Sequence, residues 1–109
     1  MTEKRTSQET VDYIVEQILN AGDVRFRKMF GEYAIYCDEK VVALVCRDEL
    51  FVKATDAGKE FASNFELTPA YPGAKPGIHV PRDKWDDTSW MAELIRVTAE
   101  ALPVPKKRK

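Results

Sequence analysis

The stretch that decides the fold is residues 27–53, which read RKMFGEYAIYCDEKVVALVCRDELFVK. It holds three runs rich in β-branched, aromatic and other apolar residues, and turn-forming residues separate these runs. Residues 33–37 and 40–46 predict two strands joined by a tight turn at Asp38 and Glu39. The nearly continuous apolar character of residues 40–46 is typical of a central strand that is covered, at least in part, on both faces.

Further strands are predicted on both sides of that hairpin. Residues 24–29 alternate apolar and basic side chains, which suits a strand with one face in water. Gly31 permits either a tight turn or a bulge before the next strand, and the sequence favours neither. After a turn at residues 47–49, residues 50–54 predict a fourth strand. We expect the large apolar side chains of this region to be mostly buried: Met29, Phe30, Ile35, Leu44 and Phe51.

A first helix is predicted before these strands. Residues 7–21 carry apolar side chains at helical spacing, in a stripe that ends with Leu19. Thr6 and Glu9 form a capping-box pattern, which satisfies exposed N–H groups at a helix start. Gly22 supplies a stop at the other end of the helix.

The second half of the chain predicts two more helices and one short strand. Asp56 is placed to cap a short middle helix, and Asp87 to cap a last helix over residues 88–102. Residues 68–77 are rich in proline and glycine and predict a loop with short extended pieces, followed by a brief strand at residues 78–80. The order α-β-β-β-β-α-β-α predicts a two-layer α+β fold, with N-terminal, middle and C-terminal helices on a mainly antiparallel sheet.

The same central stretch resembles the signature of the TfoX N-terminal domain family, bacterial proteins associated with the regulation of competence. The likeness begins with RKMFG at residues 27–31 and continues, in order and spacing, to LFVK at residues 50–53. It extends more loosely over about residues 11–102 and implies the same α+β arrangement. Where the family tends to have an aromatic-rich strand before a proline, this chain has IHVP at residues 78–81. Full-length competence regulators carry a second domain, and the resemblance does not extend to functions of that domain.

Length and charge bound the class of protein. The chain has 109 residues, 44% of them apolar, which is enough for one domain with its own core. We expect this domain to span residues 1–103 and a flexible basic tail to follow at residues 104–109. Without the four cations of that tail, 13 basic residues face 18 acidic ones, a net charge of −5. No apolar run approaches a membrane span and the N-terminus has no apolar signal-peptide core, so a cytoplasmic protein without membrane contact is predicted.

The two cysteines are predicted to be free thiols. A tight turn at residues 38–39 places Cys37 opposite Lys40, and Cys46 then lies about 20 Å further along its strand at ~3.3 Å per residue. A disulfide needs Cα atoms within about 7 Å, so this register excludes one. Two thiols without a CxxC pair also fall short of a zinc site, and we expect buried, reduced, structural cysteines.

Basic and aromatic residues alternate at one place in the folded part, where Arg25, Arg27 and Lys28 stand beside Phe26 and Phe30. Strand alternation places Arg25 and Arg27 on one face and Lys28 on the other. This candidate interaction surface suits phosphate or an acidic partner, and the alternative is a solvated strand whose cations pair with the acidic body. A second candidate contact is the tail, with its four cations Lys106, Lys107, Arg108 and Lys109.

The sequence contains no recognisable catalytic, cofactor-binding or metal-binding pattern. His79 is the single histidine, so no histidine pair can hold a metal, and no serine lies in a G-x-S-x-G motif. Asp83, Asp86 and Asp87 cluster around Trp85, but their spacing is not that of an EF-hand, and helix capping and interaction with a helix N-terminus explain Asp86 and Asp87 without a metal. The glycines match neither a P-loop nor a dinucleotide-binding motif. We therefore predict a non-enzymatic protein without a cofactor.

The leading hypothesis is a cytoplasmic module with a regulatory or protein-interaction role, whose partner is a protein of unknown identity. The alternative is weak nucleic-acid binding through the basic strand face and the tail. The acidic body and the lack of a helix-turn-helix pattern disfavour this alternative. The segment PAYPGAKPG, residues 69–77, is either a partner-binding loop or an irregular connector.

Overall fold

The computed structural model describes residues 8–29 and 32–103, and in this part of the chain six strands form one sheet. The strand order is β1-β2-β3-β4-β6-β5, and every neighbouring pair is antiparallel. The strands are β1 (Val24–Met29), β2 (Glu32–Cys37), β3 (Lys40–Cys46), β4 (Glu49–Lys53), β5 (Leu67–Pro69) and β6 (Pro76–Val80). β1 and β5 are therefore the two edges of the sheet.

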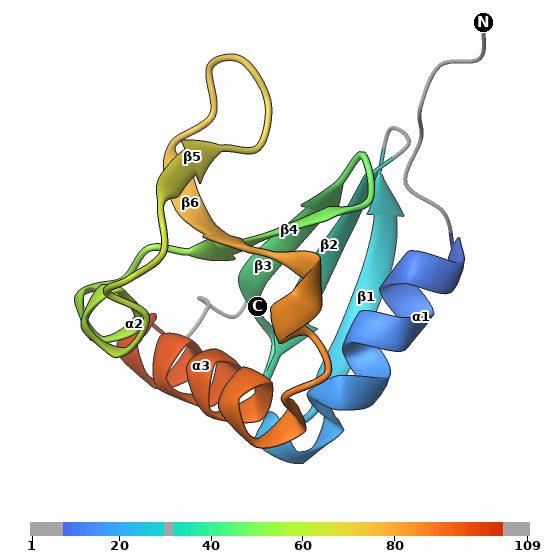
Figure 1. The fold of residues 1–109 in the computed structure, drawn as a ribbon. Helices are drawn as coiled ribbons and strands as arrows, with labels where there is room; N and C mark the ends of the chain where they lie inside the picture. The colour runs from blue at the N-terminus through green and yellow to red at the C-terminus, as the bar shows by residue number, and fades with distance from the viewer. Residues whose placement is uncertain (1–7, 30–31, 104–109) are drawn as a thin grey trace, which may run out of the picture.

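Helices form the second layer. They are α1 (Gln8–Gln17), α2 (Asp56–Phe61) and α3 (Thr88–Ala101), with short 3₁₀ turns η1 (Leu19–Ala21) and η2 (Arg82–Lys84). α1 packs on β1, α3 packs across β2, β3 and β4, and α2 lies against α3 (Figure 1). The predicted α+β fold is confirmed. No helix in the described ranges is long and apolar enough to cross a membrane.

Two tight turns fix the register of the central strands. Asp38 and Glu39 connect β2 to β3, and Arg47 and Asp48 connect β3 to β4; all four have positive φ, between 54° and 71°. Positive φ at both central residues is the type I′ geometry, whose twist matches that of the flanking strands. Asp38 is held further by Asp23, whose amide donates to Asp38 Oδ1 at 3.0 Å. The predicted turn is confirmed, and it pairs Cys37 with Lys40.

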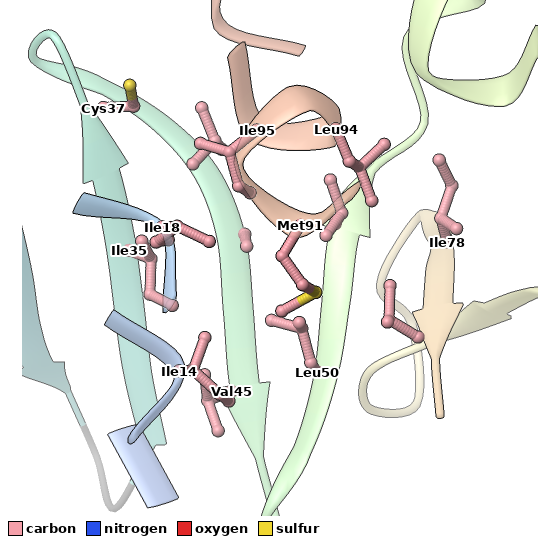
Figure 2. Packing of buried hydrophobic residues seen from close by; sticks show 14 of the residues in the cluster. Ile14, Ile18, Ile35, Cys37, Val45, Leu50, Ile78, Met91, Leu94 and Ile95 are labelled. Atoms are coloured by element: carbon pink, nitrogen blue, oxygen red, sulfur yellow. The ribbon is translucent and has the colours of Figure 1, made fainter. Parts of the chain in front are cut away.

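The core lies between the sheet and the two long helices. Ile35 pairs with Ala43, which pairs with Val52, which pairs with Ile78, so these four side chains form one row across the sheet. All of them are at most 1% exposed. Figure 2 shows such sheet residues meeting side chains from α1 and α3; the labelled residues are Ile14, Ile18, Ile35, Cys37, Val45, Leu50, Ile78, Met91, Leu94 and Ile95.

The helix ends differ from the sequence-based expectations. The first helix stops at Gln17 and continues as the 3₁₀ turn η1, so Leu19 leaves the apolar stripe and is 55% exposed. The cap of α2 is Thr55 and not Asp56, because Thr55 has extended backbone and its Oγ1 accepts the Gly58 amide at 2.9 Å. The predicted cap at Asp87 is confirmed, with the Trp90 amide donating at 3.2 Å. Thr6 and residue 7 lie outside the described residues.

The loop expected at residues 68–77 is shorter than predicted. Its ends form β5 and the start of β6, and only residues 70–75 remain outside the sheet. Pro69 and Pro76 pair with each other at the loop end of this hairpin. Proline is tolerated at strand ends and edges because no ladder hydrogen bond from its nitrogen is needed there.

Burial of the large strand residues differs between the two faces of the sheet. Ile35 is fully buried, whereas Leu44 and Phe51 are half-buried. The difference has a simple cause, because neighbouring strand residues point to opposite faces and the helices cover one face only. The Met29 side chain, Phe30 and Gly31 lie outside what the structure describes.

Candidate functional site

The face of the sheet turned away from α1 and α3 is the candidate site, and we call it the open face. Its central row runs directly across the strands, because Arg27 pairs with Ala34, Ala34 with Leu44, Leu44 with Phe51, and Phe51 with His79. Directly paired residues have their side chains on the same face. The row therefore runs from a basic residue on the β1 edge, through apolar residues, to the only histidine.

The basic end of the open face is the predicted interaction surface. The Arg25 guanidinium pairs with Asp23 at 3.2 Å, and both side chains are largely exposed. Arg27 is exposed and forms no ion pair with any residue in ranges 8–29 and 32–103. Exposed pairs of this kind contribute little to stability. The structure thus brings Arg25 and Arg27 together on one face, as predicted, and their contact with a partner stays a prediction.

Lys28 lies on the other face of β1, which also agrees with the predicted alternation. Its strand partner is Tyr33, whose hydroxyl donates to Gln8 of α1 at 3.0 Å. Phe26 shares this helix-side face and meets the Tyr33 ring edge to face, with ring centroids 5.7 Å apart. The three cations of the predicted surface are therefore split between two faces. The tail cations Lys106, Lys107, Arg108 and Lys109 lie outside the described residues.

A hollow of about 480 Å³ occupies the middle of the open face. Val41, Leu44 and Phe51 form its floor, and Tyr71 and Leu102 contribute walls. The sequence did not reveal this hollow, because its lining comes from the three strands β3, β4 and β6, residues 54–55, the 70–75 loop and the residue after α3. The one available signal was the segment PAYPGAKPG, for which a partner-binding loop was an open alternative.

The other end of the open face is polar and already internally paired. His79 Nε2 lies 2.5 Å from Glu49 Oε1, and the His79 ring lies against Phe51 with centroids 5.3 Å apart. The Cys46 thiol donates to Glu32 Oε2 at 3.1 Å. Burial, and then the Glu32 carboxylate, raise the pKa of the Cys46 thiol to about 11. A thiol held protonated in this way is a poor nucleophile, and it supports a structural role for Cys46.

The second cysteine has a similar environment. Cys37 is buried and free, and its Sγ would lie 2.9 Å from a Cβ added at Gly22. Burial, followed by the nearby carboxylates of Asp38 and Asp23, raises the pKa of the Cys37 thiol. Both thiols are free, as predicted, and within the described residues no three potential ligands from histidine, cysteine, aspartate or glutamate converge on a metal position.

The acidic cluster around Trp85 has structural contacts. Asp87 caps α3, and its hydrogen bonds from the Lys84 ammonium and then the Trp90 amide lower the pKa of its carboxyl. Asp86 accepts a hydrogen bond from the Tyr13 hydroxyl, which ties α1 to the segment before α3. The capping interpretation is confirmed for Asp87, whereas the Asp86 carboxylate binds Tyr13 of α1.

Comparison with known proteins places the chain in a family. The TfoX N-terminal domain matches residues 16–102. A protein from Spirochaeta aurantia, described as an uncharacterized 12.7 kDa protein in trpE 5'region, is 46% identical over 97 residues, which cover 89% of this chain and 84% of that protein. The match spans β1 to α3 and so includes the whole sheet with its open face. The chain belongs to the TfoX N-terminal domain family.

Proposed function

We propose that this protein is a non-catalytic regulatory module that acts in the cytoplasm by binding an acidic partner protein with the open face of its sheet. One observation carries the proposal: the helices cover one face, while the other presents exposed Arg25 and Arg27 beside half-buried Leu44 and Phe51. An apolar centre with a charged rim is typical of protein-binding surfaces. The family name connects the module with competence, and we extend that regulatory role to this chain.

Charge complementarity favours an acidic partner. Arg25, Arg27 and Lys53 all project from the open face, on strands β1 and β4. Two carboxylates of that face have internal partners, Glu32 with Cys46 and Glu49 with His79. The cations are therefore the charges most available to an incoming surface, and they would speed association with an acidic one.

A purely structural role for the arginines must be separated from binding. β1 is an edge strand, and charged residues on an edge discourage pairing with other chains. Arg25, Arg27 and Lys28 would all serve this edge role, because it does not depend on which face of the strand a side chain lies on. Partner binding on the open face requires Arg25 and Arg27 but not Lys28, so the two explanations predict different results for the same strand.

Nucleic acid is the second candidate occupant of this face. Tyr36 and Phe51 lie on an open antiparallel sheet with Arg25 and Arg27 beside them, an arrangement that also suits stacking of single-stranded bases. Both rings are only half exposed, which reduces the area available for stacking. We therefore rank nucleic acid below a protein partner.

The test is an affinity purification from the native bacterium with three forms of the full-length protein. Arg25→Glu with Arg27→Glu reverses the charge of the open face, and Lys59→Glu, on α2 away from the hollow, is the matched control. We expect a stoichiometric protein partner that the control retains and the double variant loses, and whose purified form rebinds in calorimetry. Recovery that disappears after nuclease treatment would instead favour the nucleic-acid candidate.

DNA binding by the isolated protein is expected to be weak and independent of sequence. The four tail cations can neutralise about four phosphates, which gives a slope near −3.6 in log K against log salt. Binding would then fall on the order of 100-fold between ~50 and ~200 mM salt, and would vanish when Lys106, Lys107, Arg108 and Lys109 are replaced by glutamine. Tight binding at ~150 mM salt that survives this replacement and needs Arg25 and Arg27 would contradict the proposal.

A further inference from the structure

We infer that the hollow on the open face is a binding site for a small organic anion with an apolar or aromatic body. The hollow has a volume of about 480 Å³, which lies within the usual range for sites that enclose small molecules. Its floor of Val41, Leu44 and Phe51 is apolar, as such sites require. The site shares Leu44 and Phe51 with the proposed protein-binding surface, but its lining does not include Arg25 or Arg27, and its test needs no protein partner.

The wall opposite the floor is a preformed turn. Tyr71, Pro72, Gly73 and Ala74 form a β-turn closed by the Ala74 amide, which donates to the Tyr71 carbonyl at 3.0 Å. Proline at the second position and glycine with φ of +90° at the third are the features of a type II turn. The turn is carried by the β5–β6 hairpin, so Tyr71 and Ala74 are held at the rim. A ligand therefore has little ordering to impose on this wall.

A glycine lets the strand beneath the turn lie close to the floor. Gly77 lines the hollow, and a Cβ added there would lie 3.0 Å from the Val52 carbonyl oxygen and 3.4 Å from Phe51 Cβ. A larger residue would push against the backbone of β4. Gly77 thus permits the close approach of β6 and β4 on which the floor depends.

The charge of the lining selects an anion. Lys53 and Lys75 line the hollow, and none of its described lining residues is an aspartate or a glutamate. The described parts of the chain offer neither lysine an ion-pair partner. Acidic residues outnumber basic ones in the whole chain, 18 to 17, whereas the charged residues of this lining are both cations, which distinguishes it from the average surface. A carboxylate, sulfonate or phosphate group at the rim would be attracted by both lysines.

The basic tail is a poor alternative occupant. Leu102 lines the hollow, so the chain leaves α3 close to it. The tail carries Lys106, Lys107, Arg108 and Lys109, which would meet Lys53 and Lys75 with like charge. An anion with an apolar body satisfies both the floor and the rim, whereas the tail opposes the rim.

The experiment is an amide NMR titration of the full-length protein with three probes that share one apolar body: phenylpropanoate, phenylpropanol and phenylpropylammonium. A ligand of this size in a half-open site is expected to bind with a Kd on the order of millimolar. We expect the carboxylate to bind most tightly and the ammonium least, with the largest shifts at Leu44, Phe51 and Tyr71. Equal affinities for the three probes, shifts centred on the helix side, or no shifts with any probe would overturn the inference.

Variants then test whether Lys53 and Lys75 cause the preference for an anion. Lys53→Gln with Lys75→Gln should weaken phenylpropanoate binding roughly three- to tenfold and leave phenylpropanol binding unchanged, since exposed ion pairs are individually weak. Lys59→Gln, a lysine outside the lining that pairs with Asp56, is the matched control and should change neither. A variant with all four tail cations changed to glutamine tests whether the tail occupies the hollow, and it should bind phenylpropanol as the unmodified chain does. If this variant bound phenylpropanol much more tightly, the tail would be the occupant and the inference would be wrong.

Discussion

The two faces of the sheet carry similar apolar side chains but differ in what lies over them. On the helix-covered face Ile35, Val45 and Leu50 are at most 1% exposed. On the open face Leu44 and Phe51, which alternate with these residues along the same strands, are only half-buried. Hydrophobicity alone therefore does not separate a core position from a surface one in β3 and β4. The helices decide which of the two faces is structural, and they leave the other available for binding.

The largest expected effect on the free energy of unfolding comes from a substitution on the helix-covered face. Ile35→Ala removes a fully buried side chain packed under α1, and we expect it to lower the free energy of unfolding by roughly 2–5 kcal/mol. The measurement is denaturant unfolding of the variant and the unmodified protein, with the slope of the transition compared as well. A loss below about 1 kcal/mol would mean that Ile35 does not belong to the core.

Leu44→Ala should have a smaller effect, because the residue is only half-buried on the open face. We expect a loss of roughly 1–2 kcal/mol, about half the value of a fully buried leucine. The same denaturant unfolding tests it alongside Ile35→Ala. If Leu44→Ala were as destabilising as Ile35→Ala, the open face would be covered in solution, and the distinction between the faces would fail.

Local chemistry explains which parts of the fold the sequence predicted. The turn at Asp38 and Glu39 lies between two apolar runs, and Asp87 precedes an apolar stripe, so each signal is contained in a few neighbouring residues. The alternation of Arg25, Arg27 and Lys28 is local in the same sense, and the register confirms it. Short-range patterns of this type determine backbone geometry directly.

The features that the sequence did not predict depend on distant residues. Half-burial of Leu44 follows from α3 packing on the opposite face, and no pattern within residues 40–46 specifies that face. The hollow joins Phe51, Tyr71 and Leu102, which tertiary packing alone brings together. Leu19 fits the helical spacing, yet the helix ends at Gln17 and a 3₁₀ turn begins at Leu19. For Leu44 and the hollow, tertiary packing that no local pattern encodes decides the outcome.

The polar end of the open face should respond to alkali. The pKa of the Cys46 thiol in the folded state, about 11, lies above its ordinary value of 9.0. The unfolded chain therefore loses this proton at a lower pH than the folded protein does. The contribution of the protonated Cys46 thiol to the free energy of unfolding is complete below about pH 9 and is lost as pH rises toward 11. Denaturant unfolding across this range should show a decline in stability that is smaller in Cys46→Ala. An identical decline in both proteins would show that Cys46 is not the responsible group.

The smallest expected effect on stability is at the basic end of the open face, where the effect on binding should be large. Arg25→Ala with Arg27→Ala should change the free energy of unfolding by no more than about 0.5 kcal/mol, because both side chains are exposed and the Arg25–Asp23 pair is solvated. Lys28→Ala is the matched control, since Lys28 lies on the same strand but faces the helix side. With the partner identified by affinity purification, calorimetry should show binding lost in the double variant and kept in the control. Equal losses of binding in both would contradict binding through the open face, because Lys28 does not lie on that face.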